Sequence, residues 1–233
     1  MIPAVLLDAA TAPYRTGGRF TYHFARGKLS RDPVFEFLLR EGLIGDNSEV
    51  VDIGCGQGLL ASLLTAAAKA TMLPKKWSAA HPLKGYFGVD LMQTDITRAT
   101  AALNHLGPRV RFAQGDMCEC AFPACDVVVI LDVLHYVPID AQNAVIDRVI
   151  AALRANGRLL LRIGDERGGL GFAVSQWVDR VVTRIRGHRV TPTFCRPLAD
   201  WVLLLQSKGL TVQAIPMHQG TPFANILLRA DKS

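Results

Sequence analysis

The chain has 233 residues, and half of them are hydrophobic, which suits one α/β domain with a full core and argues against intrinsic disorder. Its formal net charge of +6 is modest, so charge alone does not indicate a nucleic-acid-binding protein. No apolar run approaches the roughly 20 residues of a membrane span, and residues 1–10 lack the basic start of a secretory signal. The five cysteines, an odd number, are therefore expected as reduced thiols in a cytoplasmic protein.

The first 45 residues are expected to form an N-terminal lid and a first helix, ahead of one structural unit that spans residues 46–233. Residues 11–31 are rich in arginine, glycine and aromatic residues without a clear period, which favours a loop or a short helix packed as a lid. Asp32 and Pro33 are the residue types of a helix N-cap and a first helical position. The apolar residues after them repeat at helical spacing, so a helix begins there.

A glycine-rich turn, residues 54–58, follows a predicted buried strand at 49–53 and precedes a predicted helix at 57–69. Glycines permit turn dihedrals that other residues avoid, and they let a ligand approach the backbone. One interpretation is the dinucleotide-binding turn G-x-G-x-x-G, but Leu59 occupies its third glycine position. Asp52, at the end of the strand, would be unfavourable beside a pyrophosphate, whereas it suits a ligand that carries an ammonium group.

Strands and helices alternate along the rest of the chain, with an irregular insertion at residues 70–84. Strands are expected at 86–89, 110–113, 126–131, 158–163, 209–215 and 223–229, and helices at 95–106, 139–155, 175–186 and 197–208. The loop between the last two strands is too short for a crossover helix, so they should form an antiparallel hairpin. The pattern predicts an α/β fold, a Rossmann-like doubly wound sheet of seven mostly parallel strands with this C-terminal hairpin.

Four successive strands end at or near an aspartate: Asp52, Asp90, Asp116 and Asp132. Ligands bind doubly wound sheets at the carboxyl edge of the strands, so these side chains should converge on one crevice. The preference of aspartate for turns does not by itself account for four in order. Asp90 is placed to accept hydrogen bonds from both hydroxyls of a ribose.

These segments together resemble the motifs of the class I methyltransferases that use S-adenosylmethionine. Residues 52–58 resemble motif I, residues 85–91 motif II, residues 114–117 motif III and residues 126–137 motif IV. The likeness covers residues 45–165, and the C-terminal hairpin suits the sixth and seventh strands of the family. Residues 24–33 also resemble a segment of a bacterial small-molecule subgroup associated with aryl-polyene and acyl-carrier biosynthesis.

The resemblance implies S-adenosylmethionine as the cofactor and S-adenosylhomocysteine as the product. The cofactor-binding residues that it implies are Asp52, Gly54, Cys55, Gly56, Gly58, Asp90, Leu91, Asp116, Met117 and Asp132. Within this set, the glycines would surround the methionine moiety, Asp90 would hold the ribose, and Asp116 would accept from the adenine amino group. Arg26 or Lys28 is a candidate partner for the cofactor carboxylate, although each could equally be a solvated charge.

Methyl transfer to oxygen benefits from a general base, and histidine suits that role near neutral pH. His135, after the fourth strand, and His218, at the end of the sixth, are the candidates. Tyr22, Tyr136 and Trp177 are candidates for the wall of a substrate pocket, with ordinary packing as the alternative. No metal is expected, because the reaction requires none and the cysteines lack the usual spacing of zinc ligands.

The expected function is therefore methyl transfer to a small molecule or to a carrier-bound aryl or acyl group, most readily at oxygen. Basic residues cluster at 69–84 and 180–196, either as solvated faces or as a docking site for an acidic acyl carrier protein. One alternative is an RNA or DNA methyltransferase, but residues 132–135 lack the Pro-Pro run used for base amines, and no nucleic-acid partner is expected. The other alternative is a non-catalytic cofactor-binding scaffold.

Overall fold

The computed structural model of the chain describes residues 1–71, 73–74, 77, 82–164, 194–217 and 225–233. The chain divides into two compact units, Met1–Val128 and Val129–Ser233. None of the helices in the described ranges combines the length and the hydrophobicity of a membrane span.

The first unit contains three parallel strands, β1 (Glu49–Ile53), β2 (Gly85–Asp90) and β3 (Val110–Gln114). β2 lies between the other two, with Gly88 opposite Asp52 on β1 and opposite Phe112 on β3. Helix α4 (Leu59–Lys69) follows β1, and helix α5 (Gln93–Leu103) with the short helix η2 (Asn104–Arg109) connects β2 to β3. Because the strands are parallel, their carboxyl ends lie at one edge.

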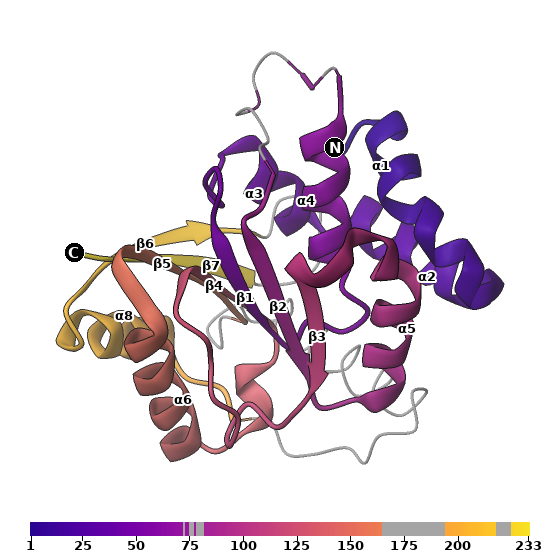
Figure 1. Cartoon of the computed structure of the whole chain (residues 1–233). Coiled ribbons are helices and arrows are strands. Elements are labelled where there is room, and N and C mark those ends of the chain that lie inside the picture. Colours follow the sequence, from indigo (N-terminus) through magenta and orange to yellow (C-terminus); the bar gives the residue numbers. More distant parts are fainter. Residues whose placement is uncertain (72, 75–76, 78–81, 165–193, 218–224) are drawn as a thin grey trace. The chain divides into compact units, whose positions relative to one another are not determined.

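The first 40 residues are almost entirely helical, as α1 (Ala4–Thr11), η1 (Ala12–Gly17), α2 (Gly18–Arg31) and α3 (Pro33–Arg40). The start of α3 is as expected, since the carboxylate of Asp32 accepts from the amide of Val34 at 3.2 Å. The preceding region is more regular than the expected loop or short helix. Figure 1 shows α1 and α2 beside α4 and α5, and α1 packs against α4.

Strand β4 (Cys125–Leu131) begins in the first unit and ends in the second. The second unit adds η3 (Leu134–Tyr136), α6 (Ile139–Ala152), β5 (Leu153–Gly164), α8 (Leu198–Ser207), β6 (Leu210–Pro216) and β7 (Asn225–Lys232). The seven strands form one sheet in the order β3-β2-β1-β4-β5-β7-β6, in which β7 is antiparallel to both β5 and β6. The predicted α/β sheet with its antiparallel C-terminal hairpin is confirmed.

One predicted boundary is wrong. The pattern indicated a helix to residue 155, but α6 ends at Ala152 and β5 begins at the next residue. The Nζ of Lys232 donates to the carbonyls of Ile150 (2.7 Å) and Leu153 (2.6 Å), so a residue at the far end of the chain binds the carbonyls at the helix end. Asn156, expected to end the helix, lies within β5 with φ of 59°.

Candidate functional site

The glycine turn is tied to the end of β2 through its backbone. The amides of Gly54 and Cys55 both donate to the carbonyl of Val89, at 2.8 and 3.1 Å. Gly54, Gly56 and Gly58 have φ of 76°, 53° and 72°, in the left-handed region that favours glycine. The turn therefore requires glycine for its backbone path.

Gly56 and Gly58 differ in what surrounds them. A Cβ added to Gly58 would lie 2.7 Å from Cζ of Phe112, so this glycine is needed for packing against β3. Among the described residues, beyond its two chain neighbours, no heavy atom lies within 4 Å of a Cβ added to Gly56. The backbone at Gly56 is consequently open to a ligand.

Asp90 holds the turn from the end of β2. Its Oδ2 accepts from the amide of Gly56 and its Oδ1 from the amide of Met92, both at 2.8 Å. The side chain is partly exposed, and a carboxylate has further acceptor sites for ligand hydroxyls. Leu91, the next residue, is 61 % exposed despite being large and apolar. An acceptor and an apolar surface thus lie side by side at this edge.

Asp52 is placed differently from the other strand-end aspartates. It is only 4 % exposed, and it accepts a hydrogen bond from the hydroxyl of Tyr86. Burial raises the pKa of Asp52 to about 7; the Tyr86 bond opposes this shift, and the charge of Asp90 adds to it. Burial likewise raises the pKa of the neighbouring Cys55 thiol. Both residues support the turn from the interior.

Asp116 is exposed at the end of β3, and Met117 beside it is partly exposed. Oδ1 of Asp116 accepts from the amide of Cys118 at 2.7 Å, and the backbone carbonyl of Asp116 accepts from the amide of Cys120 at 2.9 Å. The amide of Gly115 donates to the carbonyl of Asp90 at 3.0 Å. The structure therefore brings the ends of β2 and β3 together, as the sequence predicted.

Gln57, inside the turn, is a residue that sequence analysis missed. Its side chain is 2 % exposed, and its Nε2 donates to Oδ1 of Asp95 on α5 at 3.2 Å. Its Oε1 is buried with no hydrogen-bond partner in the described part of the chain. Its backbone carbonyl accepts from the hydroxyl of Tyr14 at 2.9 Å. A glutamine in a glycine turn gives no sequence signal of these contacts.

In the second unit, Asp132 directly follows β4 and has φ of 58°, a left-handed conformation uncommon for a residue other than glycine. Arg162 on β5 donates to both of its carboxylate oxygens, through Nε at 2.8 Å and through Nη2. Arg162 is 3 % exposed and was also missed from the sequence. The sequence feature that could have identified Arg162 is its position as the single charged residue within the apolar run 159–163.

His135 lies in η3, with its ring 4.2 Å from that of Tyr136. Burial lowers the pKa of His135, and the charge of Asp132 opposes this shift, so the imidazole is neutral at pH 7. The carbonyl of His135 accepts from the amide of Phe194 at 2.7 Å. Nε2 of Gln142 donates to the carbonyl of Phe194 at 2.7 Å, which fixes this segment against α6.

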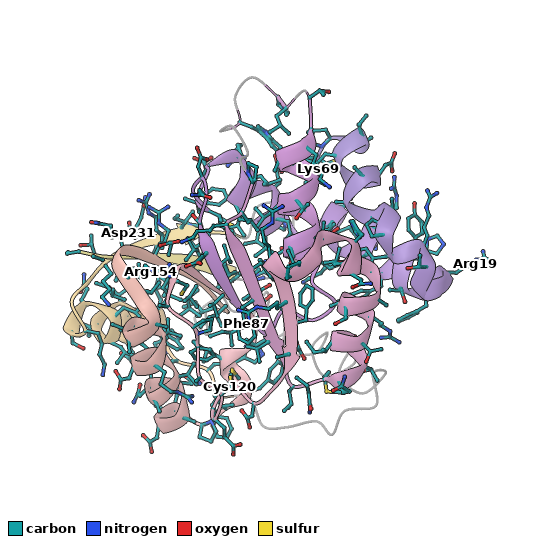
Figure 2. The ribbon with its side chains drawn as sticks, viewed as in Figure 1. Arg19, Lys69, Phe87, Cys120, Arg154 and Asp231 are labelled. Carbon is teal, nitrogen blue, oxygen red and sulfur yellow. The ribbon has the colours of Figure 1, made fainter. Side chains whose placement is uncertain are left out.

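The basic candidates on α2 have protein partners: Arg26 pairs with Asp8, and Lys28 pairs with Asp32 at 2.8 Å. Tyr22 is partly exposed, with the guanidinium of Arg15 5.1 Å from its ring centre. Figure 2 shows Arg19 at the outer end of the same helix, directed away from it. His218 and Trp177 lie outside the described residues. Within the described ranges, no group of three or more His, Cys, Asp or Glu side chains is placed to hold a metal ion.

The region that contains the turn and the strand-end aspartates has a counterpart among known families. Residues 51–159 match the family model of the methyltransferase domain. This match runs from β1 into β5 and includes Asp52, Asp90, Asp116 and Asp132.

Two curated relatives match parts of the chain. The tetracenomycin polyketide synthesis 8-O-methyl transferase TcmO of Streptomyces glaucescens is 31% identical over 96 residues, 40% of this chain and 28% of the relative. Carboxy-S-adenosyl-L-methionine synthase of Chromohalobacter salexigens is 28% identical over 126 residues, 53% of this chain and 43% of the relative. The matches thus span less than half the length of each relative.

Among solved structures, the magnesium protoporphyrin IX methyltransferase of Synechocystis PCC 6803 with bound S-adenosylhomocysteine is similar over 92% of this chain and 88% of that one. The TM-score is 0.60 and the sequence identity is 20%. This likeness establishes a shared fold with methyltransferases.

Proposed function

We propose that the protein is an S-adenosylmethionine-dependent methyltransferase that acts on a small molecule or on a carrier-bound aryl or acyl group, at oxygen. The observation that carries the proposal is the contact between Gly56 and Asp90, where an open glycine backbone meets a partly exposed carboxylate at the end of β2. The methyltransferase-domain match and the shared fold support the cofactor class.

The residues of the first unit fit this cofactor. Asp90 offers acceptors to ribose hydroxyls, exposed Leu91 offers an apolar face to the adenine, and Asp116 accepts from an amino group. Gly56 leaves room for the amino-acid end against the turn. Arg26 and Lys28 already have carboxylate partners, so either would have to exchange its partner to bind the cofactor carboxylate.

S-adenosylmethionine, when bound, would supply an electrophilic methyl group. The protein must then orient an acceptor and remove its proton. His135 suits the second task because its lowered pKa keeps it neutral and able to accept a proton at pH 7. Arg162 holds Asp132 beside this segment in one orientation. His218 remains the second candidate for the base.

The substrate assignment rests on candidate aromatic residues and on one relative. Tyr136 packs on His135, and Tyr22 and Trp177, the latter outside the described residues, are proposed as further substrate contacts. TcmO is named as an 8-O-methyl transferase of tetracenomycin polyketide synthesis, which supports an oxygen atom as the acceptor. The basic residues Arg180, Arg184, Arg186 and Arg189, all outside the described ranges, are proposed to dock an acidic carrier protein. If reversing the charge of two of them left turnover of a carrier-bound substrate unchanged, this part of the proposal would be discarded.

Calorimetric titration with S-adenosylhomocysteine tests the cofactor site. Wild type should bind it, and Asp90→Asn should weaken binding by about tenfold or more, because an amide cannot accept from both backbone N–H groups and the ribose. Asp147→Asn, a change on the exposed side of α6, is the matched control and should bind like wild type. Absence of binding by wild type would refute the proposed cofactor.

Product analysis then separates the reactions. Mass spectrometry of incubations with S-adenosylmethionine and phenolic or aryl-acyl acceptors should show an acceptor heavier by one methylene unit. A carboxylated cofactor would instead match the reaction that the second relative is named for. Methylated RNA or DNA would favour the nucleic-acid alternative, and cofactor binding without any product would favour a scaffold.

A further inference from the structure

Tyr14, in η1, connects the N-terminal helices to the glycine turn. Its side chain is fully buried, and its hydroxyl donates to the backbone carbonyl of Gln57 at 2.9 Å. Burial raises the pKa of Tyr14 far above its usual value, so the phenol keeps its proton and remains a donor. The contact joins η1 to the middle of the turn across 43 positions of sequence.

The other side of Gln57 is held by α5. Its Nε2 donates to Oδ1 of Asp95, which also accepts from Arg98 at 3.2 Å. The guanidinium of Arg98 lies 5.6 Å from the ring centre of Phe20 on α2. Gln57 is therefore held through its backbone carbonyl by η1 and through its side chain by α5. Helix α2 contacts Arg98, which binds the same Asp95.

The Tyr14 hydrogen bond acts on a peptide group of the turn that Asp90 does not bind. Asp90 binds the amide of Gly56, whereas Tyr14 binds the carbonyl between Gly56 and Gly58. That carbonyl belongs to the peptide that joins Gln57 to Gly58, and both flanking glycines have left-handed φ. Without the Tyr14 bond, this peptide loses a partner that fixes its rotation.

We infer that Tyr14 is a positioning residue for the amino-acid end of the cofactor, which makes the N-terminal helical segment a working part of the cofactor site. This inference rests on the proposed cofactor, whose methionine moiety is assigned to the glycine turn. The adenosine end depends on Asp90, Leu91 and Asp116, none of which contacts Tyr14 in any bond described above. Loss of the Tyr14 hydroxyl should consequently affect one end of the ligand only.

The test compares two ligands. S-adenosylhomocysteine carries the amino-acid end, and 5′-methylthioadenosine lacks it. Tyr14→Phe should weaken S-adenosylhomocysteine by about fivefold to tenfold, the value of one hydrogen bond, and leave methylthioadenosine within about twofold of wild type. The control is Thr11→Val, which removes another buried hydroxyl of the N-terminal segment. Within the described part of the chain this hydroxyl donates inside α1, to the carbonyls of Leu7 at 2.8 Å and Asp8 at 3.4 Å. This variant should lower the melting temperature without changing the ratio of the two affinities.

The possible outcomes are distinct. Selective loss of S-adenosylhomocysteine in Tyr14→Phe, with an unchanged ratio in Thr11→Val, supports the inference. Equal weakening of both ligands, or no change in either, overturns it. If wild type binds neither ligand, the proposed function fails first, and that result is recognisable before any variant is measured.

Discussion

Asp52 should make the stability of the protein depend on pH in the direction opposite to that of most carboxylates. Its carboxyl is buried in β1, and its pKa is raised from 3.8 to about 7. Between these pH values the unfolded chain loses the proton while the folded chain keeps it. The stability that Asp52 contributes is therefore present at low pH, declines as pH rises through this window and is constant above it. A shift of about three pKa units corresponds to about 4 kcal/mol.

The assay is urea unfolding at several pH values between about 4.5 and 8 for wild type and Asp52→Asn. The amide accepts from Tyr86 as the carboxyl does but does not titrate. The free energy of unfolding of wild type, minus that of the variant, should fall by about 3 kcal/mol across this range, because pH 4.5 already lies above the unfolded pKa. The subtraction removes the titration of every group that the two proteins share.

Parallel profiles for the two proteins would refute the reasoning, since they would mean that Asp52 is ionised in the fold throughout. A difference that rises with pH would show a lowered pKa, with the Tyr86 hydrogen bond stronger than the cost of burial.

Three further predictions concern single contacts. Gly58→Ala should lower the free energy of unfolding by about 2–4 kcal/mol, because of the left-handed φ at this position and a clash with the ring of Phe112. Gly56→Ala should lower it by only about 1–2 kcal/mol but abolish tight S-adenosylhomocysteine binding. Urea unfolding measures the first effect and calorimetry the second. Asp132→Asn should lower the free energy of unfolding by about 3 kcal/mol, because it leaves the buried guanidinium of Arg162 facing a neutral amide. Arg162→Met should lower it by less, because the carboxylate that it leaves is 30% exposed. Equal losses in urea unfolding would contradict this expectation. Lys232→Met should cost about 1–2 kcal/mol by releasing two carbonyls at the end of α6, measured as a lower melting temperature.

The fold was predictable because its signals are local. Alternation of apolar strands with amphipathic helices predicts a parallel sheet, and a short final loop predicts the antiparallel hairpin. Parallel strands then place their carboxyl ends at one edge, which is why Asp90 and Asp116 could be expected close together. The end of α6 was not predictable, because Lys232, a residue about 80 positions away, binds its carbonyls.

The length of helix α2 was not predicted, for a related reason. Helix α2 contains Gly27 and few apolar residues, so its sequence has no strong helical period. Ala25 and Leu29 are nevertheless buried, and packing stabilises the helix where propensity does not. The partners within the site were hidden in the same way. Arg162 reaches Asp132 over 30 positions, and no local pattern links them.

The strand-end aspartates supply less charge to the site than their number suggests. Asp132 is neutralised by Arg162, and Asp52 keeps its proton up to a pH of about 7. Asp90 and Asp116 are the two other strand-end aspartates, and their proposed partners, the ribose and the adenine, are neutral. The ionic end of the cofactor then depends chiefly on the path of the glycine turn, whose backbone carbonyls can accept from an ammonium group. A residue that fixes the turn, such as Tyr14, should therefore affect affinity more than the Asp52→Asn substitution.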